Sequence, residues 1–356
     1  MINLNIADVP VIFTKPFKGL TAEELAAITS ETPEVVYFLD IPPMAGSLQA
    51  LDQVRSTLPG VRVIWNDHHS TPQAAEWVAK VKAALGTDAT LVTRDDHPAC
   101  STLVTCGKAQ SHGKRVLVLS DNDADGLTAS MKLCGLVYAE LDADAAILDG
   151  PRSGQTKEGG LSELGCLLVV GLSTLPPYDK DNPTPSERAK VELFTKFVAA
   201  TQGDEGARAW LVKKIDEYQA GVAVAEGLAL TATQVAKGVW SVDAGKTRYD
   251  QTTLTNLLEA KEGCVVTVVA KQVGPLVKDH GGQISLARRT GLTTFSLRDM
   301  LTDELRAVTD NDEKVARGCI SNTDFLLHVS PDVYAKVVLP ALVARFGKVG
   351  DDTPAS

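Results

Sequence analysis

Three mainly apolar runs in the first part of the chain each end in polar residues. Short runs of this kind, bounded by polar residues, are typical of buried strands in a parallel sheet. The runs are residues 35–39, which lead into Asp40, residues 61–65, which lead into Asn66-Asp67-His68-His69, and residues 116–119, which lead into Ser120-Asp121-Asn122-Asp123-Ala124-Asp125-Gly126.

Helical segments alternate with these runs. Residues 47–58, closed by Pro59-Gly60, and residues 127–141 predict helices. Two further apolar runs, residues 145–148 and 166–171, predict additional strands of the same sheet. The alternation predicts an α/β fold with a parallel sheet, in which ligands bind at the carboxyl ends of the strands.

The alternation of strand and helix patterns is interrupted at residue 176. A Pro-rich, charged stretch over residues 176–188 precedes helical patterns at 186–201 and 205–218. From about Gly221, strand-like runs at 264–270, 284–287 and 325–329 are separated by glycines and helices. We therefore expect a first domain over residues 1–220, a second, smaller α/β domain over 221–349 and a polar tail over 350–356.

The composition is that of an ordinary globular protein, with 44% hydrophobic and 22% charged residues. No uncharged apolar stretch reaches the roughly 18 residues that span a bilayer, and the first residues lack a basic-then-apolar signal pattern. Six scattered cysteines without a Cys-x-x-Cys pair predict reduced thiols. These features predict a soluble, cytoplasmic protein that does not associate with membranes.

The charge balance bears on the partners. With 35 Lys and Arg against 45 Asp and Glu, the formal net charge is −10. Broad, non-specific duplex binding depends on neutralising many phosphates and is disfavoured by this charge. A nucleic-acid enzyme stays open, because a metal site or a local basic groove can hold phosphate on an acidic protein.

The polar strand ends converge on one crevice if the three strands are neighbours. So many like charges share a site only when cations are present. Carboxylates with imidazole suit Mn²⁺, with Mg²⁺, Co²⁺ or Zn²⁺ as alternatives, and a carboxylate can bridge two ions about 3.5–4 Å apart. Such a pair holds a phosphate, generates a hydroxide and stabilises the leaving oxygen, which implies hydrolysis of a phosphoester or phosphoanhydride.

Each part alone has a plainer interpretation. An aspartate at the end of a strand is usually a helix cap or a solvated turn. The Asp121–Gly126 segment could be a calcium-type loop, although the glutamate such a loop needs is missing where Leu133 and Cys134 stand. It could also supply the acidic pair of a Toprim-type domain, which needs a catalytic glutamate and leaves Asp67-His68-His69 unexplained.

Four segments together resemble the DHH phosphoesterase superfamily, which includes RecJ-type exonucleases, nano-RNases, cyclic-dinucleotide phosphodiesterases and family II pyrophosphatases. Residues 64–70 resemble its Asp-His-His signature, 116–130 its first motif in the RecJ-like form, 37–42 its second motif, and 99–104 its Ser-rich helix. Here the first motif follows Asp-His-His by about fifty residues instead of preceding it. We interpret the chain as circularly permuted, with residues 11–15 as the second family strand.

The resemblance implies roles for individual residues. Asp121, Asp123, Asp125 and His68 would bind metal, Asp40 would bridge two ions, Asp67 would orient His68, and His69 would face the substrate phosphate. The family has one more aspartate in its fourth motif; our choice for it is Asp204, and Asp95, Asp96 and Asp179 are the alternatives.

The second domain carries a segment with a weaker resemblance. Family members often have a C-terminal substrate domain (DHHA1-like) with a Gly-Gly-Gly-His loop and an arginine-bearing strand. In residues 280–289 the histidine precedes Gly281 and Gly282, and Arg288 and Arg289 follow. The arginines could bind a phosphate or terminal nucleotide, or this could be a glycine turn before an edge strand. Residues 150–157 lack phosphate-loop spacing and predict a surface loop.

The sequence as a whole predicts a Mn²⁺-dependent, two-metal phosphoesterase. We expect a nuclease that acts on single-stranded nucleic acid or short oligonucleotides, because the first motif is RecJ-like. The alternatives are a hydrolase of small phosphoanhydrides or cyclic dinucleotides, and a non-catalytic DHH-like scaffold in a replication or repair assembly. The sequence leaves the oligomeric state undetermined.

Overall fold

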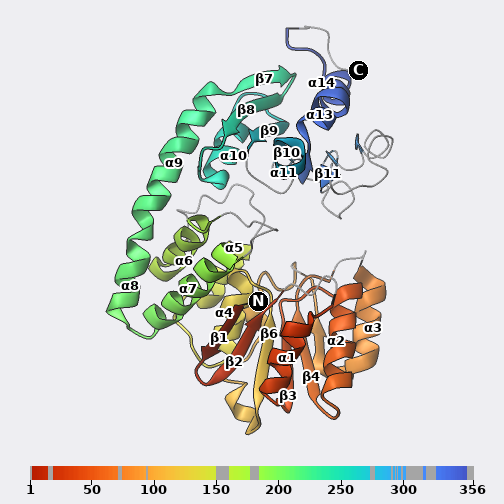
Figure 1. The fold of residues 1–356 in the computed structure, drawn as a ribbon, viewed down its shortest axis with the longest axis vertical. Coiled ribbons are helices and arrows are strands. Elements are labelled where there is room, and N and C mark those ends of the chain that lie inside the picture. The colour runs from red at the N-terminus through yellow and green to blue at the C-terminus, as the bar shows by residue number, and fades with distance from the viewer. Residues whose placement is uncertain are drawn as a thin grey trace. The chain divides into compact units, whose positions relative to one another are not determined.

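The fold was obtained as a computed structural model, which describes residues 2–14, 19–70, 74–93, 95–149, 160–176, 184–272, 277–289, 292, 294, 296–297, 300–301, 316–317 and 326–350. The chain divides into two compact units, and the division falls between Ile215 and Asp216. This point lies inside helix α9 (Lys214–Thr231). Each unit is built on a six-stranded sheet (Figure 1).

The sheet of the first unit has the strand order β1-β2-β6-β3-β4-β5. Its neighbours pair in parallel, except for the antiparallel β1–β2 pair at one edge. The predicted α/β fold with a parallel sheet is thus confirmed. The strands are β1 (Ile2–Ile6), β2 (Val9–Phe13), β3 (Val35–Leu39), β4 (Arg62–Asp67), β5 (Ala89–Leu91) and β6 (Val116–Ser120).

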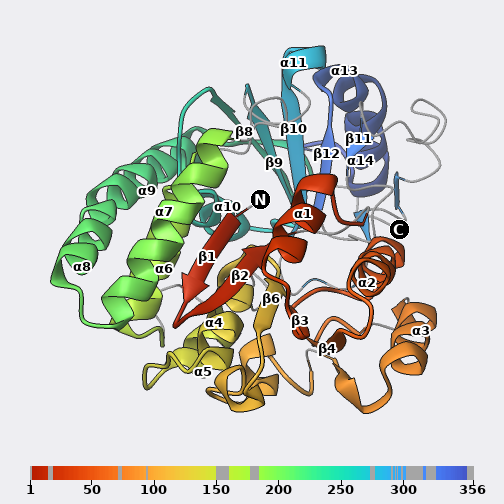
Figure 2. The ribbon, with the colours of Figure 1, turned by 60° about the horizontal axis from the view of Figure 1, so that its bottom comes forward.

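Helices cover both faces of this sheet (Figure 2). One face packs against α1, α2 and α3 through a core that includes Trp65, and the other packs against α4 to α8 through a core that includes Phe13 and Phe194. The helices are α1 (Ala22–Ser30), α2 (Ala45–Thr57), α3 (Ala75–Leu85), α4 (Ala124–Leu133), α5 (Leu141–Asp149), α6 (Glu163–Ser173), α7 (Thr184–Thr201) and α8 (Glu205–Val212), with short 3-10 turns η2 (Gly86–Asp88), η3 (Cys100–Leu103) and η4 (Gln110–His112).

Two sequence predictions about this unit were wrong. Residues 145–148 and 166–171 lie in helices α5 and α6, not in strands. A short apolar run is compatible with a buried helix as well as with a buried strand, and here Ser162 caps α6 through a hydrogen bond from the Gly165 N–H. The helix expected over 127–141 begins earlier and ends at Leu133.

The second unit has a mixed sheet in the order β11-β12-β10-β9-β8-β7; among its described strands β8 and β9 pair in parallel and the other neighbours pair antiparallel. One face packs on α13 to α14 and the other on α9 and α10. The described elements are β7 (Thr233–Ala236), β8 (Val239–Gly245), α10 (Gln251–Glu259), β9 (Val266–Lys271), α11 (Val277–His280), β10 (Gln283–Arg288), β11 (Ala316–Arg317), β12 (Leu326–Val329), α13 (Pro331–Val333), η5 (Tyr334–Val338) and α14 (Leu339–Phe346).

Two general features complete the fold. Cysteines 100, 106, 134, 166 and 264 are all free thiols, and Cys106 and Cys166 are exposed. Within the described parts of the chain, no helix has both the length and the apolar character required to cross a bilayer.

Candidate metal centre

Three parallel strands deliver the candidate residues to one edge of the first sheet. In the register of the sheet, Leu39 of β3 lies opposite Asn66 of β4 and opposite Ser120 of β6. Asp40, Asp67 and Asp121 are the next residues of these strands, so they leave the sheet at the same level. The convergence follows from parallel pairing alone, since the carboxyl ends of parallel strands share an edge.

Asp40 is held in an unusual backbone conformation. Its φ is +56°, in the left-handed region that few residues other than glycine adopt, although aspartate tolerates it better than most. Its N–H donates to the carbonyl of Asn66, and its side chain is completely buried. The neighbouring strand therefore holds the turn that aims this carboxylate inward.

The two adjacent histidines have different environments. His68 is completely buried, whereas His69 is partly exposed. The Asp67 carboxylate accepts hydrogen bonds from the backbone N–H of His69, at 2.8 Å, and from its Nδ1, also at 2.8 Å. Asp67 thus orients His69 and not His68, which differs from the sequence expectation. The orienting partner of His68 is the carbonyl oxygen of His97, 2.8 Å from Nδ1.

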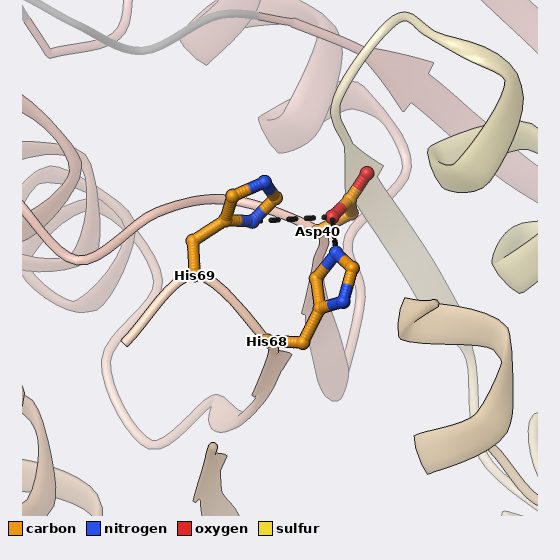
Figure 3. Close-up of side chains that lie close together, drawn as sticks. All are labelled: Asp40, His68 and His69. Carbon is orange, nitrogen blue, oxygen red and sulfur yellow. Dashed lines mark ion pairs between the residues drawn. The ribbon is translucent and has the colours of Figure 1, made fainter. Parts of the chain in front are cut away.

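Three carboxylates surround the other ring nitrogen of His68. Its Nε2 lies 3.3 Å from Asp40 Oδ1, 3.2 Å from Asp125 Oδ2 and 3.4 Å from Asp149 Oδ2. Asp40 Oδ1 is also 3.4 Å from Nδ1 of His69 (Figure 3). The structure therefore has two potential ligand groups that share His68, namely Asp40, His68 and His69, and His68, Asp125 and Asp149.

The hydrogen-bond chemistry of His68 calls for a cation at this point. A carbonyl oxygen only accepts, so Nδ1 must donate its proton to His97, and in the neutral ring Nε2 is then an acceptor. That acceptor faces carboxylate oxygens, which also only accept. Three buried atoms have no hydrogen-bond partner of good geometry among the described residues: both carboxylate oxygens of Asp40 and the Nε2 of His68. A metal ion would satisfy all of these atoms, so the residues present fit the predicted metal.

The pKa values of Asp40 and His68 reflect the same crowding of buried acceptor groups. Burial raises the pKa of Asp40 well above its usual range, and the neighbouring Asp123, Asp125 and Asp67 add to the effect. Burial alone would lower the pKa of His68, but its contacts with Asp125, Asp40 and the His97 carbonyl outweigh burial and raise that pKa to about 11. Without a metal, a proton on His68 occupies the place between the carboxylates.

Asp125 belongs to the loop that joins β6 to α4. Its carboxylate is buried and accepts hydrogen bonds from the backbone N–H groups of Cys100, at 2.7 Å, and Ser101, at 3.4 Å. Burial and the nearby Asp40, Asp125 and Asp67 raise the pKa of the Cys100 thiol, so this cysteine remains protonated. The η3 segment therefore holds Asp125 without adding a thiolate ligand.

Gly126 allows this loop to turn tightly. A Cβ at this position would lie 2.3 Å from the carbonyl oxygen of Asp121, so no other residue fits without moving the backbone. Asp123 caps α4 by accepting from the Gly126 N–H at 2.9 Å, and Asp121 accepts from the N–H of Asn122. The side chains of Asp121 and Asp123 are partly exposed and lie outside the two ligand groups around His68.

Asp149 is the site residue that the sequence analysis missed. It is the last residue of α5 and follows an apolar run, 145–148, in the same way as Asp40 follows residues 35–39. That recurring pattern of an apolar run ending in aspartate was the available signal. Instead, the run was assigned to a strand and the segment from Gly150 onward to a surface loop; residues 150–159 lie outside the described residues.

The aspartates considered for the fourth motif lie elsewhere or are not described. Asp204 is exposed and caps α8 by accepting from the Ala207 N–H at 2.8 Å. Asp95 and Asp96 are exposed, and Asp96 accepts from the Thr93 hydroxyl. Asp179 falls outside the described residues. The structure therefore assigns Asp204 a capping contact and brings Asp149 to His68.

The candidate substrate residues of the second unit lie around β10. Gly281, with φ of +69°, is exposed, and Gly282 is buried, where a Cβ would lie 2.9 Å from Pro331 Cγ. Arg288 is the last residue of β10, and the exposed Arg289 donates its backbone N–H to the Val265 carbonyl. The two glycines thus precede β10, and the two arginines lie at its end.

The chain matches known proteins in structure but not in sequence. No protein-family model matches it, and no curated protein sequence does. A solved structure described as "Crystal structure of exonuclease RecJ bound to manganese" aligns with 95% of this chain and 80% of its own, at 14% sequence identity and a TM-score of 0.38.

Proposed function

We propose that the protein is a metal-dependent phosphoesterase whose site lies at the carboxyl edge of the first sheet. The observation that supports this proposal best is the Nε2 of His68, which faces three carboxylates at 3.2–3.4 Å, two of them, Asp40 and Asp125, buried. Without a metal, these carboxylates share a single proton on His68. A divalent cation would replace that proton and compensate more of the buried negative charge.

The proposed ligands surround His68, whose Nε2 has one lone pair and can bind one ion. Asp125 and Asp149 would join His68 on that ion, Asp40 would be shared with a second ion, and Asp121 and Asp123 are proposed as further ligands at the loop. Oxygen and imidazole donors suit Mn²⁺, with Mg²⁺ or Co²⁺ as alternatives. When bound, a pair of such ions polarises a phosphate and supplies a nucleophile at neutral pH.

His69 has a separate role in this proposal. Its Nδ1 is held by the Asp67 carboxylate at 2.8 Å, which directs the opposite ring edge away from Asp67. Unlike His68, it is partly exposed. These features suit a residue that binds a phosphate oxygen of the substrate, with Asp67 as its orienting partner.

We propose single-stranded nucleic acid or short oligonucleotides as the substrate, and a DHH-type domain that is circularly permuted. The proposed permutation is supported by the position of β6, which follows β1 to β5 in the chain yet pairs in parallel with both β2 and β3. The second unit would bind the substrate through Arg288 and Arg289 beside Gly281 and Gly282. A cytoplasmic location is part of the same proposal.

The test is a metal-dependent hydrolysis assay with matched variants. The chain, freed of metal and then supplied with Mn²⁺, is incubated separately with end-labelled single-stranded DNA, the same sequence as RNA, a cyclic dinucleotide and pyrophosphate. We expect the oligonucleotides to be cleaved by the unaltered chain and by Asp204→Asn, and the rate to fall at least about 100-fold in His68→Gln and Asp149→Asn.

The other outcomes are equally informative. Cleavage of only the cyclic dinucleotide or pyrophosphate would assign the chain to the small-substrate alternative. Absence of hydrolysis with all four substrates, together with absence of Mn²⁺ binding, would leave the non-catalytic scaffold. Equal rates in the unaltered chain and in His68→Gln would refute the metal centre.

A further inference from the structure

Helix α7 is firmly anchored in the first unit. Phe194 is completely buried, and its ring meets that of Phe13 edge-on with centroids 5.2 Å apart. Leu193 packs so closely on α6 that a Cβ at Gly171 would lie 2.3 Å from its Cδ1. The backbone of α7 one turn earlier is therefore held in a fixed position relative to the sheet.

Lys190 stands one turn before Phe194 and contacts the acidic loop. Its Nζ donates to the backbone carbonyl of Asn122 at 2.6 Å and lies 3.5 Å from the Asn122 side-chain oxygen. Asn122 lies between Asp121 and Asp123, and Asp125 follows three residues later. A lysine 68 residues further along the chain thus forms a hydrogen bond with the centre of the loop.

We propose that Lys190 is a positioning residue for the metal centre, an inference that rests on the function proposed above. A charge-assisted hydrogen bond to a loop carbonyl is about twice as strong as a neutral one. It fixes the turn in which Asp123 caps α4 and Asp125 reaches His68. It adds to the backbone N–H groups of Cys100 and Ser101, which hold Asp125, in opposing relaxation of the loop under the mutual repulsion of its three carboxylates.

The sign of the effect on metal affinity separates positioning from simple electrostatics. A lysine near a cation site repels the cation, so removal of its charge alone should tighten Mn²⁺ binding. Removal of a contact that holds ligands in place should weaken binding, and partners of this kind are typically worth about 10–100-fold in affinity. Lys190→Met removes both the charge and the contact with the loop, and we expect the loss of the contact to have the larger effect on Mn²⁺ affinity.

The experiment measures Mn²⁺ affinity of the full, metal-freed chain by isothermal titration calorimetry, with the electron paramagnetic resonance signal of free Mn²⁺ as a second readout. We expect Lys190→Met to weaken binding by about 10-fold or more. We expect Lys190→Arg, which keeps a charged donor, to retain most of the affinity. Lys196→Met, the same substitution six residues later on α7, is the matched control, and thermal unfolding of all variants reports their folding.

Each outcome supports or overturns the role of Lys190. Unchanged or tighter binding in folded Lys190→Met would refute it and leave the metal centre intact. Weakening of the same size in Lys196→Met would also refute it, because the effect would then belong to the helix as a whole. If the unaltered chain binds no Mn²⁺, the proposed function itself fails, a result distinct from the other two.

Discussion

Two aspartates of the first unit are equally buried and serve opposite purposes. Asp144 of α5 is completely buried, and its carboxylate accepts from the Ser162 N–H at 2.8 Å and from the Ser162 hydroxyl at 2.5 Å. Asp40 is just as buried, but its Oδ1 lies 3.3 Å from Nε2 of His68 and 3.4 Å from Nδ1 of His69. One carboxylate has two donors of its own from Ser162, and the other shares a single imidazole with Asp125 and Asp149.

The difference shows how burial of a charge can be interpreted. The carboxylate of Asp144 contacts Ser162, the N-cap residue of α6, where the positive end of the helix compensates its charge, so the protein alone accounts for it. Asp40 is left with a raised pKa, because burial outweighs its contact with His68. A buried carboxylate with its own hydrogen-bond donors in the protein stabilises the fold. A buried carboxylate without donors of its own is available to bind a ligand.

The largest expected effect comes from Asp40→Asn. The loss of a charged ligand should lower the Mn²⁺-dependent hydrolysis rate by about 1,000-fold, which corresponds to several kcal/mol of transition-state stabilisation. In the metal-free protein, however, the free energy of unfolding should rise by about 1 kcal/mol, because an amide can donate to the surrounding carboxylates and carries no charge. Steady-state kinetics and urea unfolding without metal measure the two effects.

Added metal sharpens the same test. At a Mn²⁺ concentration 100 times its dissociation constant, the unaltered chain should gain about 2.7 kcal/mol in its free energy of unfolding, and Asp40→Asn should gain much less. A metal-free Asp40→Asn chain that is less stable than the unaltered one would mean that Asp40 supports the fold. Asp40 and Asp144 would then have the same structural role, and the contrast drawn between them would be wrong.

The same substitution at Asp144 should have the reverse outcome. An asparagine keeps one acceptor oxygen but turns an NH₂ group toward a Ser162 donor. The free energy of unfolding should therefore fall by about 2–3 kcal/mol, the value of a buried hydrogen bond to a charged group plus an unsatisfied donor. Mn²⁺ affinity should change by less than about 3-fold at temperatures where the variant is folded. Chemical unfolding and calorimetric titration decide between this result and a metal role for Asp144.

Much of the site could be predicted from local sequence because parallel sheets bring strand ends together. Apolar runs at 35–39 and 116–119 identified β3 and β6, and their register brings Asp40 and Asp121 to one edge. The α/β fold and the parallel sheet were predicted in the same way. A helix–strand ambiguity, by contrast, concealed Asp149, since four apolar residues fit either element.

Contacts between distant segments could not be predicted. The carbonyl that orients His68 belongs to His97, and the lysine that holds the acidic loop lies 68 residues downstream of Asn122. Neither contact has a local pattern, because a backbone carbonyl has no sequence signature and a single lysine on a helix is usually solvated. Such partners become visible only when the helices are packed on the sheet.

The smallest expected effect concerns Asp204, which sequence reasoning placed at the metal and the structure places at the start of α8. Asp204→Ala removes the oxygen that accepts from the Ala207 N–H, so the free energy of unfolding should fall by about 1 kcal/mol, as for other N-cap losses. Mn²⁺ affinity should stay the same, because this exposed carboxylate has no place in either ligand group around His68. Asp204→Ser, which restores a capping oxygen without a charge, should recover most of the stability. If Asp204→Ala weakened Mn²⁺ binding and Asp204→Ser did so equally, the charge and not the cap would matter, and Asp204 would join Asp40 as a carboxylate reserved for metal.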